Sequence, residues 1–215
     1  MFHDRRDAAL RLVPELRRYG NLPGALVLAI PRGGLPIGGV LARELNLKLD
    51  AILTKKIGHP DNREFAIGAV SLTGQMVDEE TVRREGISPR YVDEEITRVR
   101  DDMRSRYRRY HPAGRPASVA GKTVILTDDG AATGRTLLVA IDLLRREGAA
   151  RIVVAIPVAP PDTVELLESR ADEVICLETP LMFMAIGEFY VEFSQVSDEE
   201  AVDILREADS RVKAK

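Results

Sequence analysis

The chain has 215 residues, of which 45% are hydrophobic and 30% are charged with both signs mixed, so it can bury a full core and is not disordered. Its formal net charge of -3 argues against nucleic acid as a partner held by bulk electrostatics. One cysteine, Cys176, excludes an internal disulfide, and the absence of a signal peptide or membrane-spanning stretch predicts a cytoplasmic protein.

The N-terminal part of the sequence alternates helical and strand-like patterns. Residues 4–19 place apolar positions at helical spacing. The run ALVLAI at 25–30 predicts a buried strand, and the turn PRGG follows it at 31–34. A helix is predicted over 36–46 and a second strand over 50–57. The buried side of the first helix is expected to carry Leu10, Leu12, Val13 and Leu16.

The middle of the chain predicts a hairpin and a long helix. A polar loop at 58–63 precedes a predicted hairpin formed by 65–72 and 75–78, with Thr73-Gly74 at its turn. Ser88 and Pro89 are typical of a helix start, and the helix is expected to end before a linker at 111–120. Apolar residues recur along this helix every three or four positions: Val92, Ile96, Val99, Met103, Tyr107 and Tyr110.

The last hundred residues give the clearest alternation of strands and helices. Predicted strands cover 123–127, 151–158 and 173–177. Predicted helices cover 134–147 and 162–170, and another begins at Asp198. Apolar strands that alternate with helices indicate an α/β fold with a doubly wound, mainly parallel sheet. We expect a single domain over 1–215, with a small hood at about 178–196 to which the helix at 4–19 contributes.

The segment VILTDDGAATGRT, residues 124–136, carries the strongest functional signal. Asp128 and Asp129 follow an apolar strand, and a run of small residues leads from them into a helix. Small residues let backbone N–H groups close on an anion, and the N-terminus of a helix adds partial positive charge. The two carboxylates would repel phosphate but suit vicinal hydroxyls. The segment therefore predicts a site for a ribose 5-phosphate.

Other phosphate loops fit this segment less well. A Walker A loop needs four residues between its first Gly and a Gly-Lys pair, whereas three separate Gly130 from Gly134 and Arg135 stands in place of Lys. The dinucleotide pattern Gly-x-Gly-x-x-Gly is absent. A plain strand-to-helix turn would explain the glycines but not two adjacent carboxylates.

The segment resembles the phosphoribosyl-pyrophosphate (PRPP) motif of type I phosphoribosyltransferases, and the resemblance extends over about residues 20–195. It implies that Asp128 and Asp129 hold the 2'- and 3'-hydroxyls of the ribose. Ala132 stands where some oxopurine transferases carry an Asp base, so the resemblance implies no base from this loop. The residues that would surround the 5'-phosphate are Ala131, Ala132, Thr133, Gly134, Arg135 and Thr136.

Two further loops resemble parts of the same family. Arg32, Gly33 and Gly34 resemble the loop that binds pyrophosphate, for which a simple turn with a surface Arg is the alternative. Lys55 and Lys56 end the predicted second strand, and only one of them can face the ligand because adjacent strand residues point to opposite faces. The following loop resembles a flexible catalytic lid with three polar candidates, for which a solvated turn is the alternative. These candidates are His59, Arg63 and Glu64.

The acceptor side is expected in the predicted hood. Phe183 lies in a segment that resembles the base-binding part of hypoxanthine-type transferases, where an aromatic ring stacks on a purine. The alternative is that this ring packs on the edge of the sheet. The arginines and tyrosines of 104–110 could suggest nucleic acid, but the tyrosines fit the apolar stripe of the long helix and leave the arginines on a solvated face.

The resemblance implies a phosphoribosyltransferase that moves the 5-phosphoribosyl group from PRPP to a nitrogenous acceptor, with a purine-like base as the candidate. Catalysis would involve Asp128, Asp129, Arg32, Lys55, Lys56 and Arg63. Mg²⁺ would be bound through the substrate, with no direct protein ligand, and a homodimer is expected. The rival hypothesis is a regulator that senses PRPP and binds nucleic acid or a partner protein. A ribosyl-phosphate hydrolase is a third, for which the sequence offers no water-activating group.

Overall fold

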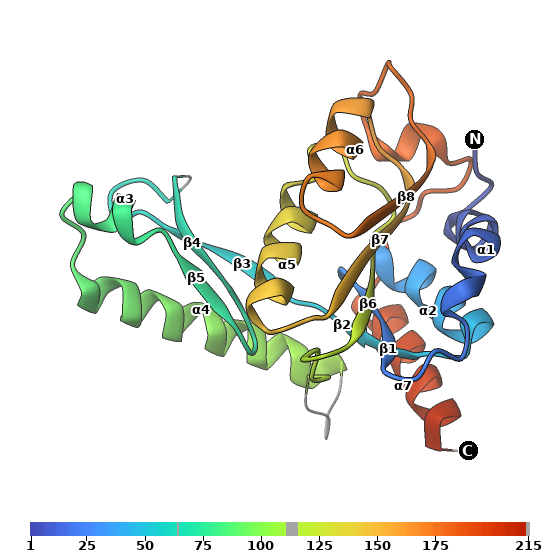
Figure 1. Cartoon of the computed structure of the whole chain (residues 1–215), viewed down its shortest axis with the longest axis horizontal. Coiled ribbons are helices and arrows are strands. Elements are labelled where there is room, and N and C mark those ends of the chain that lie inside the picture. Colours follow the sequence, from blue (N-terminus) through green and yellow to red (C-terminus); the bar gives the residue numbers. More distant parts are fainter. Residues whose placement is uncertain (64, 111–115, 214–215) are drawn as a thin grey trace.

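The structure is a computed structural model that describes residues 1–63, 65–110 and 116–213. Its centre is a sheet of five parallel strands in the order β2-β1-β6-β7-β8 (Figure 1). The fold class predicted from the sequence, a doubly wound parallel sheet, is therefore confirmed. The strands are β1 (Ala25–Ala29), β2 (Lys48–Ala51), β6 (Thr123–Thr127), β7 (Arg151–Val158) and β8 (Glu173–Glu178).

Helices cover both faces of this sheet because apolar strand residues point to both sides of it. Val27, Ile125 and Val153 lie in one buried cluster with three helices, α1 (Arg5–Leu16), α2 (Gly34–Leu45) and α7 (Asp198–Lys213). Their neighbours Leu26, Val124 and Ile152 point to the opposite face and join a second cluster. That cluster includes apolar residues of α5 (Arg135–Arg146) and α6 (Pro161–Glu168).

A second, antiparallel sheet extends away from the first, on the left of Figure 1. It consists of β3 (Thr54–Gly58), β4 (Ala66–Ser71) and β5 (Gln75–Val77), and it is followed by α3 (Glu79–Arg84) and α4 (Pro89–Tyr110). The predicted hairpin around Thr73-Gly74 is confirmed as β4–β5. The predicted apolar stripe of α4 is also confirmed, because the residues at all six of its positions are buried.

The strands β3, β4 and β5 with helices α3 and α4 form a second lobe. Two carboxylates of the main body, those of Asp50 and Glu147, accept hydrogen bonds from this lobe. The carboxylate of Asp50, which is 2% exposed, accepts hydrogen bonds from Tyr107 Oη of α4 at 2.9 Å and from the Ala117 amide at 2.7 Å. Glu147, at the end of α5, accepts hydrogen bonds from Ser71 Oγ at 2.7 Å and from Thr73 Oγ1 at 2.5 Å. The lobe is therefore bonded to the main body at two places, the C-terminal end of α4 and the β4–β5 turn.

Three sequence expectations need correction. The predicted strand at 50–57 is two strands in two sheets, because the chain leaves the main sheet at Ile52 and Leu53 and then pairs with β4. Helix α3 was not expected, since its six residues are too few for an apolar period to appear. In α1, Leu10 is 40% exposed. The buried side of α1 consists of Ala8, Ala9, Leu12 and Leu16.

The remaining expectations agree within a few residues or lie outside the described ranges. Residues 111–115 of the predicted linker belong to the latter group. After β8 the chain crosses a mostly irregular stretch that contains a 3₁₀ turn, Ile186–Phe189, before α7 begins at Asp198. The division into one domain with a hood at 178–196 stays a prediction. None of the described helices has the length and apolar character that a bilayer crossing requires.

Candidate functional site

The site lies where the order of the main sheet changes direction. From β1 the chain continues to β2 on one side, and from β6 it continues to β7 on the other, so the carboxyl ends of β1 and β6 flank a topological switch point. The Ile30 amide donates to the Thr127 carbonyl over 3.0 Å. The loop at 31–34 and the loop at 128–134, far apart in the sequence, therefore lie side by side.

Glycine is needed where these two loops meet. A Cβ atom on Gly33 would lie 2.2 Å from Asp129 Oδ2, and one on Gly34 would lie 2.8 Å from the Thr127 carbonyl oxygen. Both distances are shorter than any van der Waals contact allows. The Pro31–Arg32 peptide bond beside them is cis. Arg32 forms a 3.4 Å ion pair with Asp198 at the start of α7, and its side chain is 28% exposed.

The predicted phosphate loop leads directly into α5. Gly134 is the N-cap residue with φ of 65°, and no side chain caps the helix. The amide groups of the first turn of an α-helix have no partner within the helix, and they attract anions together with the helix dipole. Ala132, Thr133, Arg135 and Thr136 are exposed, whereas Ala131 is buried and donates its amide to the Val158 carbonyl. The loop thus presents uncapped donors to solvent.

Two adjacent carboxyl groups lie at the base of this loop. Burial, followed by the negative charge of Asp129, raises the pKa of Asp128 well above its usual value. Burial also raises the pKa of Asp129, which is 8% exposed, although the charge of Arg5 opposes that rise. The ionised pair is therefore costly in the free protein. Ligand groups that donate hydrogen bonds to it, such as hydroxyls, would relieve that cost.

Arg5 of α1 is a site residue that the sequence reasoning missed. Its Nε and Nη2 atoms each lie 2.8 Å from Asp129 Oδ2, and its Nη1 donates to the Ser194 carbonyl over 2.8 Å. Its guanidinium carbon lies 3.9 Å from the ring centroid of Phe193. No local pattern distinguishes Arg5 from the other arginines of α1, so only the three-dimensional structure reveals this contact.

A cleft of about 690 Å³ opens beside these groups. Arg5, Arg32, Gly33, Asp129 and Ala132 form one wall. The stretch after β8 forms the other wall with residues 184–187 and 193–196. Tyr190 of that stretch donates its hydroxyl to the Asp129 carbonyl over 2.7 Å, so the wall is bonded to the acidic loop.

Several predicted site residues lie away from this cleft. Lys55 and Lys56 lie on β3 with exposed side chains. Arg63 lies at the far end of the smaller sheet, close enough to Tyr91 and Glu95 of α4 to influence their pKa values. His59 lies in the same loop and accepts a hydrogen bond from the Asp61 amide. Glu64 is outside the described residues.

The predicted acceptor residue does not line the cleft. The ring of Phe183 stacks on Phe189, with centroids 5.1 Å apart, and packs against the buried cluster beneath it. The aromatic ring in the cleft wall is that of Phe193, which stacks on Tyr190 at 4.9 Å. An acceptor role for Phe183 stays a prediction.

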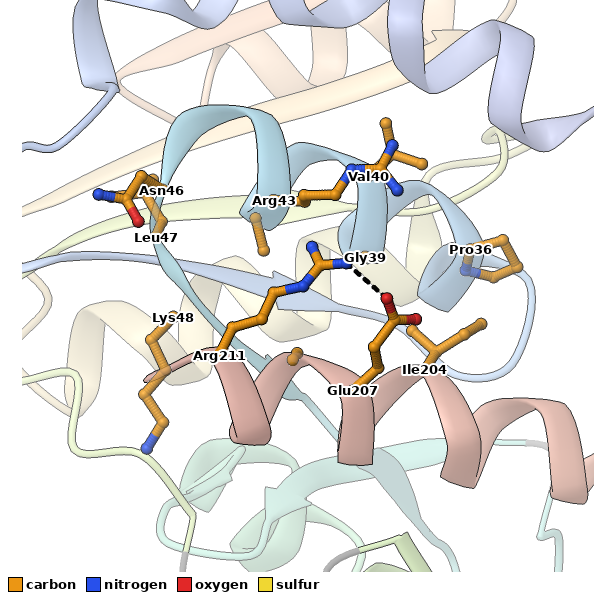
Figure 2. Close-up of a pocket in the computed structure, with 12 residues that line it drawn as sticks. Pro36, Gly39, Val40, Arg43, Asn46, Leu47, Lys48, Ile204, Glu207 and Arg211 are labelled. Atoms are coloured by element: carbon orange, nitrogen blue, oxygen red, sulfur yellow. Dashed lines mark hydrogen bonds and ion pairs between the residues drawn. The ribbon is translucent and has the colours of Figure 1, made fainter. Parts of the chain in front are cut away.

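A separate pocket of about 410 Å³ lies between α2 and α7 (Figure 2). It shares no lining residue with the cleft. Figure 2 shows Glu207 and Arg211 of α7 paired across one turn, with Arg43 of α2 and Lys48 of β2 at the rim. Within the described ranges, no group of three or more His, Cys, Asp or Glu side chains could hold a metal ion.

Comparison with known proteins identifies the family. Residues 6–194, which begin directly after Arg5, match the family model described as a phosphoribosyl transferase domain. Proteins from two strains of Mycobacterium tuberculosis, provisionally named phosphoribosyl transferases, are 33% identical over 209 residues. That alignment covers 97% of the chain but 47% of each relative, so the chain spans about half their length.

A solved structure is similar to nearly the whole chain. The crystal structure of a protein from Thermus thermophilus superposes with a TM-score of 0.83 at 39% identity. The superposition covers 96% of this chain and 98% of that one. The chain therefore belongs to the phosphoribosyl transferase family, as its sequence motifs predict.

Proposed function

We propose that the chain is an enzyme that transfers the 5-phosphoribosyl group of PRPP to a nitrogenous acceptor and releases pyrophosphate. The observation that carries this proposal is the meeting of two loops at one switch point. The acidic pair and the uncapped start of α5 follow β6, and the glycine loop with Arg32 follows β1. Together these groups offer donors for two phosphate-bearing ends and acceptors for the hydroxyls between them.

Each part of PRPP has a partner in this arrangement. The 5'-phosphate would bind the exposed amides and hydroxyls of 132–136 at the start of α5. The ribose hydroxyls would donate to Asp128 and Asp129, which adds hydrogen bonds to two carboxylates whose ionised forms are disfavoured by burial. The pyrophosphate would extend toward Arg32 and the backbone of Gly33 and Gly34. The reacting carbon of the ribose would then face the cleft.

The reaction would break the bond between that carbon and the pyrophosphate oxygen and form a bond to the acceptor nitrogen. Negative charge grows on the leaving pyrophosphate, where Arg32 and Lys55 or Lys56 would stabilise it. Positive charge grows on the ribose ring, above the ionised carboxylate of Asp129. Since Ala132 offers no base, orientation and electrostatics would supply most of the rate enhancement.

Mg²⁺ is the expected cofactor. As expected from the sequence, the ion would be bound mainly through the substrate, with no direct protein ligand. When bound, the ion would neutralise charge on the leaving group.

The remaining expectations belong to the same proposal. Loop 58–64, with Arg63, would close over the cleft and exclude water during the reaction. The acceptor would be a small nitrogenous molecule, with a purine-like base and Phe183 as the first candidates. A cytoplasmic homodimer remains the expectation from the sequence. The rival function, a PRPP-sensing regulator, would use the same pocket without turnover.

The test is calorimetric titration of PRPP with Mg²⁺ into the protein and into the double variant Asp128→Asn/Asp129→Asn. We expect micromolar binding that the double variant loses. Asp142→Asn, which removes a carboxylate of α5 that pairs with Arg170, is the control and should bind normally. Absence of binding by the unchanged protein would reject the proposal. Pyrophosphate release only in the presence of an acceptor, screened from purines onward, would separate the enzyme from the sensor.

A further inference from the structure

Arg5 holds one oxygen of the Asp129 carboxylate in the wall of the cleft. Its Nε and Nη2 atoms both lie 2.8 Å from Oδ2. The two side chains are each only 11% exposed. This pair is therefore a nearly buried ion pair in the wall of the cleft, and the direction of the Asp129 carboxylate follows from it.

The position of Arg5 is itself fixed by the rest of the fold. Phe2 donates its amide to the Phe189 carbonyl over 2.8 Å and accepts from the Val191 amide at 2.9 Å. One residue farther on, His3 accepts from the Glu192 amide at 2.8 Å. These bonds attach the start of α1 to the stretch that forms the second wall of the cleft.

The guanidinium plane is fixed as well. The guanidinium carbon of Arg5 lies 3.9 Å from the centroid of the Phe193 ring, which itself stacks on Tyr190 at a centroid distance of 4.9 Å. The bond from Nη1 to the Ser194 carbonyl holds the remaining edge of the group. Arg5 is thus held by groups on three sides, which is typical of a side chain that orients another residue.

We propose that Arg5 is a positioning residue of the phosphoribosyl site, which fixes the direction of the Asp129 carboxylate through Oδ2 so that the carboxylate can accept from a ribose hydroxyl. This inference rests on the proposed function. It also assigns a function to the first turn of α1, whose amphipathic pattern gives no sign of a site residue.

Charge supports the same role. Asp129 is next to Asp128 on its own loop, and Arg5 of α1 and Arg32 of the glycine loop line the same cleft. The hydroxyl of Tyr190 contacts the Asp129 backbone from the opposite wall. Among the influences on the pKa of Asp129, Arg5 is the strongest that lowers it. Without Arg5 the carboxyl would bind a proton more readily and would offer a weaker acceptor.

The experiment compares Arg5→Gln with Arg6→Gln in PRPP–Mg²⁺ titrations between about pH 6 and pH 9. Arg6 is exposed and belongs to the same helical turn, so its variant matches the change in charge and helix. We expect Arg5→Gln to weaken binding about tenfold near neutral pH and to recover affinity as pH rises and Asp129 ionises. Arg6→Gln should show the same affinity and the same pH dependence as the unchanged protein. The ionisation of PRPP itself affects all variants equally, so it cancels in this comparison. Arg5→Lys, which keeps the charge, should restore part of the affinity.

A second measurement does not depend on PRPP. In the ligand-free protein, carbon NMR titration of the Asp129 carboxyl should give a higher pKa in Arg5→Gln than in Arg6→Gln. If PRPP fails to bind while this difference appears, the proposed function fails and the contact between Arg5 and Asp129 remains. If Arg5→Gln tightens PRPP binding, Arg5 blocks the site in the free protein, and if binding is unchanged at every pH, Arg5 has no role in binding. Either result shows that the inference is wrong. Phe193→Leu, which retains the charge, provides the same comparison if Arg5→Gln does not fold, and it should weaken binding by a smaller factor.

Discussion

Gly33 and Gly34 have no side chain at the point where the loop after β1 contacts the residues after β6. The Asp129 carboxylate occupies the space that a Cβ atom of residue 33 would need. Glycine is therefore required there for close approach, and no positive φ is involved, since φ at Gly33 is -58°. The requirement is local to the site and has little bearing on the core.

Gly33→Ala should weaken PRPP binding by at least about tenfold, or about 1.4 kcal/mol, because the loop must move away from Asp129. Calorimetric titration measures this loss, and the thermal midpoint should change little. Gly39→Ala is the matched control on the other side of α2. Its new methyl group would meet only Ile204 of the α7 pocket (Figure 2), so PRPP binding should persist. Equal loss in both variants would contradict this account.

Asp128→Asn should stabilise the ligand-free protein at neutral pH. Folding raises the pKa of Asp128, so the folded state binds its proton more tightly than the unfolded state does. The stabilisation from this group is full below the unfolded pKa of about 4 and is lost as pH rises from there through the folded pKa. At pH 7 the variant avoids that loss, so its thermal midpoint should lie above that of the unchanged protein. Thermal melts at pH 7 and pH 4 check this, and a gain of the same size at both values would refute it.

The second lobe depends on a few polar bonds between elements that lie far apart in the sequence. Asp50 at the end of β2 receives the Tyr107 hydroxyl of α4 and the Ala117 amide, which precedes β6. Each hydrogen bond to a buried carboxylate offsets part of the cost of removing its charge from water, so the loss of a donor is destabilising. These bonds therefore set the direction in which α4 leaves the main sheet.

Tyr107→Phe should lower the free energy of unfolding by about 1–3 kcal/mol, because it removes a donor from the buried Asp50 carboxylate. Tyr110→Phe is the control on the same stripe, since the one hydrogen bond of the Tyr110 hydroxyl within the described residues is accepted from Arg106 Nε at 3.1 Å. Its loss should cost less than about 1 kcal/mol. Urea denaturation measures both values. Similar losses in the two variants would show that packing of the rings, and not the bond to Asp50, stabilises α4.

The sequence predicts helices and strands well where a local pattern of apolar residues is compatible with a single type of secondary structure. The apolar runs of β1, β6 and β7, and the six-residue stripe of α4, have such patterns and are confirmed. The segment DAILTKKI is ambiguous, because nothing local tells a continuous strand from two strands in different sheets. The acidic pair and the glycine loop could be found because each is a short motif at a strand end. Arg5 could not, since its role depends on contacts with residues more than a hundred positions away.

In the molecule as a whole, the candidate site residues are divided between the main sheet with its helices and the second lobe. The cleft lies at the edge of the main sheet, while loop 58–63 lies at the far end of the smaller sheet (Figure 1). The loop is bonded to α4, because Tyr91 Oη of that helix donates to the Gly58 carbonyl over 2.9 Å. If this loop acts as a lid, the lobe or the loop must approach the cleft when the ligand binds.

Spin labels at Asp61→Cys and Glu165→Cys, in a Cys176→Ser background, should come several ångströms closer when PRPP and Mg²⁺ are added. Asp61 is exposed in the loop, and Glu165 is exposed on α6 two residues after Thr163, which contacts the phosphate loop. A second pair of labels, at Asp61→Cys and Arg90→Cys, lies entirely on the second lobe. The distance within this pair changes if the loop moves relative to the lobe and stays constant if the whole lobe moves. Pulsed electron resonance measures both distances. An unchanged distance to Glu165 would exclude lid closure by this loop.

The direct pairing of β1 with β6 also governs when the pocket can exist during folding. Every residue of the second lobe lies between these two strands in the sequence, yet their backbones are neighbours. Such a contact closes a long loop, and its entropic cost must be met before either half of the pocket is complete. A ligand of this pocket should therefore leave the refolding rate almost unchanged and slow the unfolding rate, because it recognises a feature that forms late.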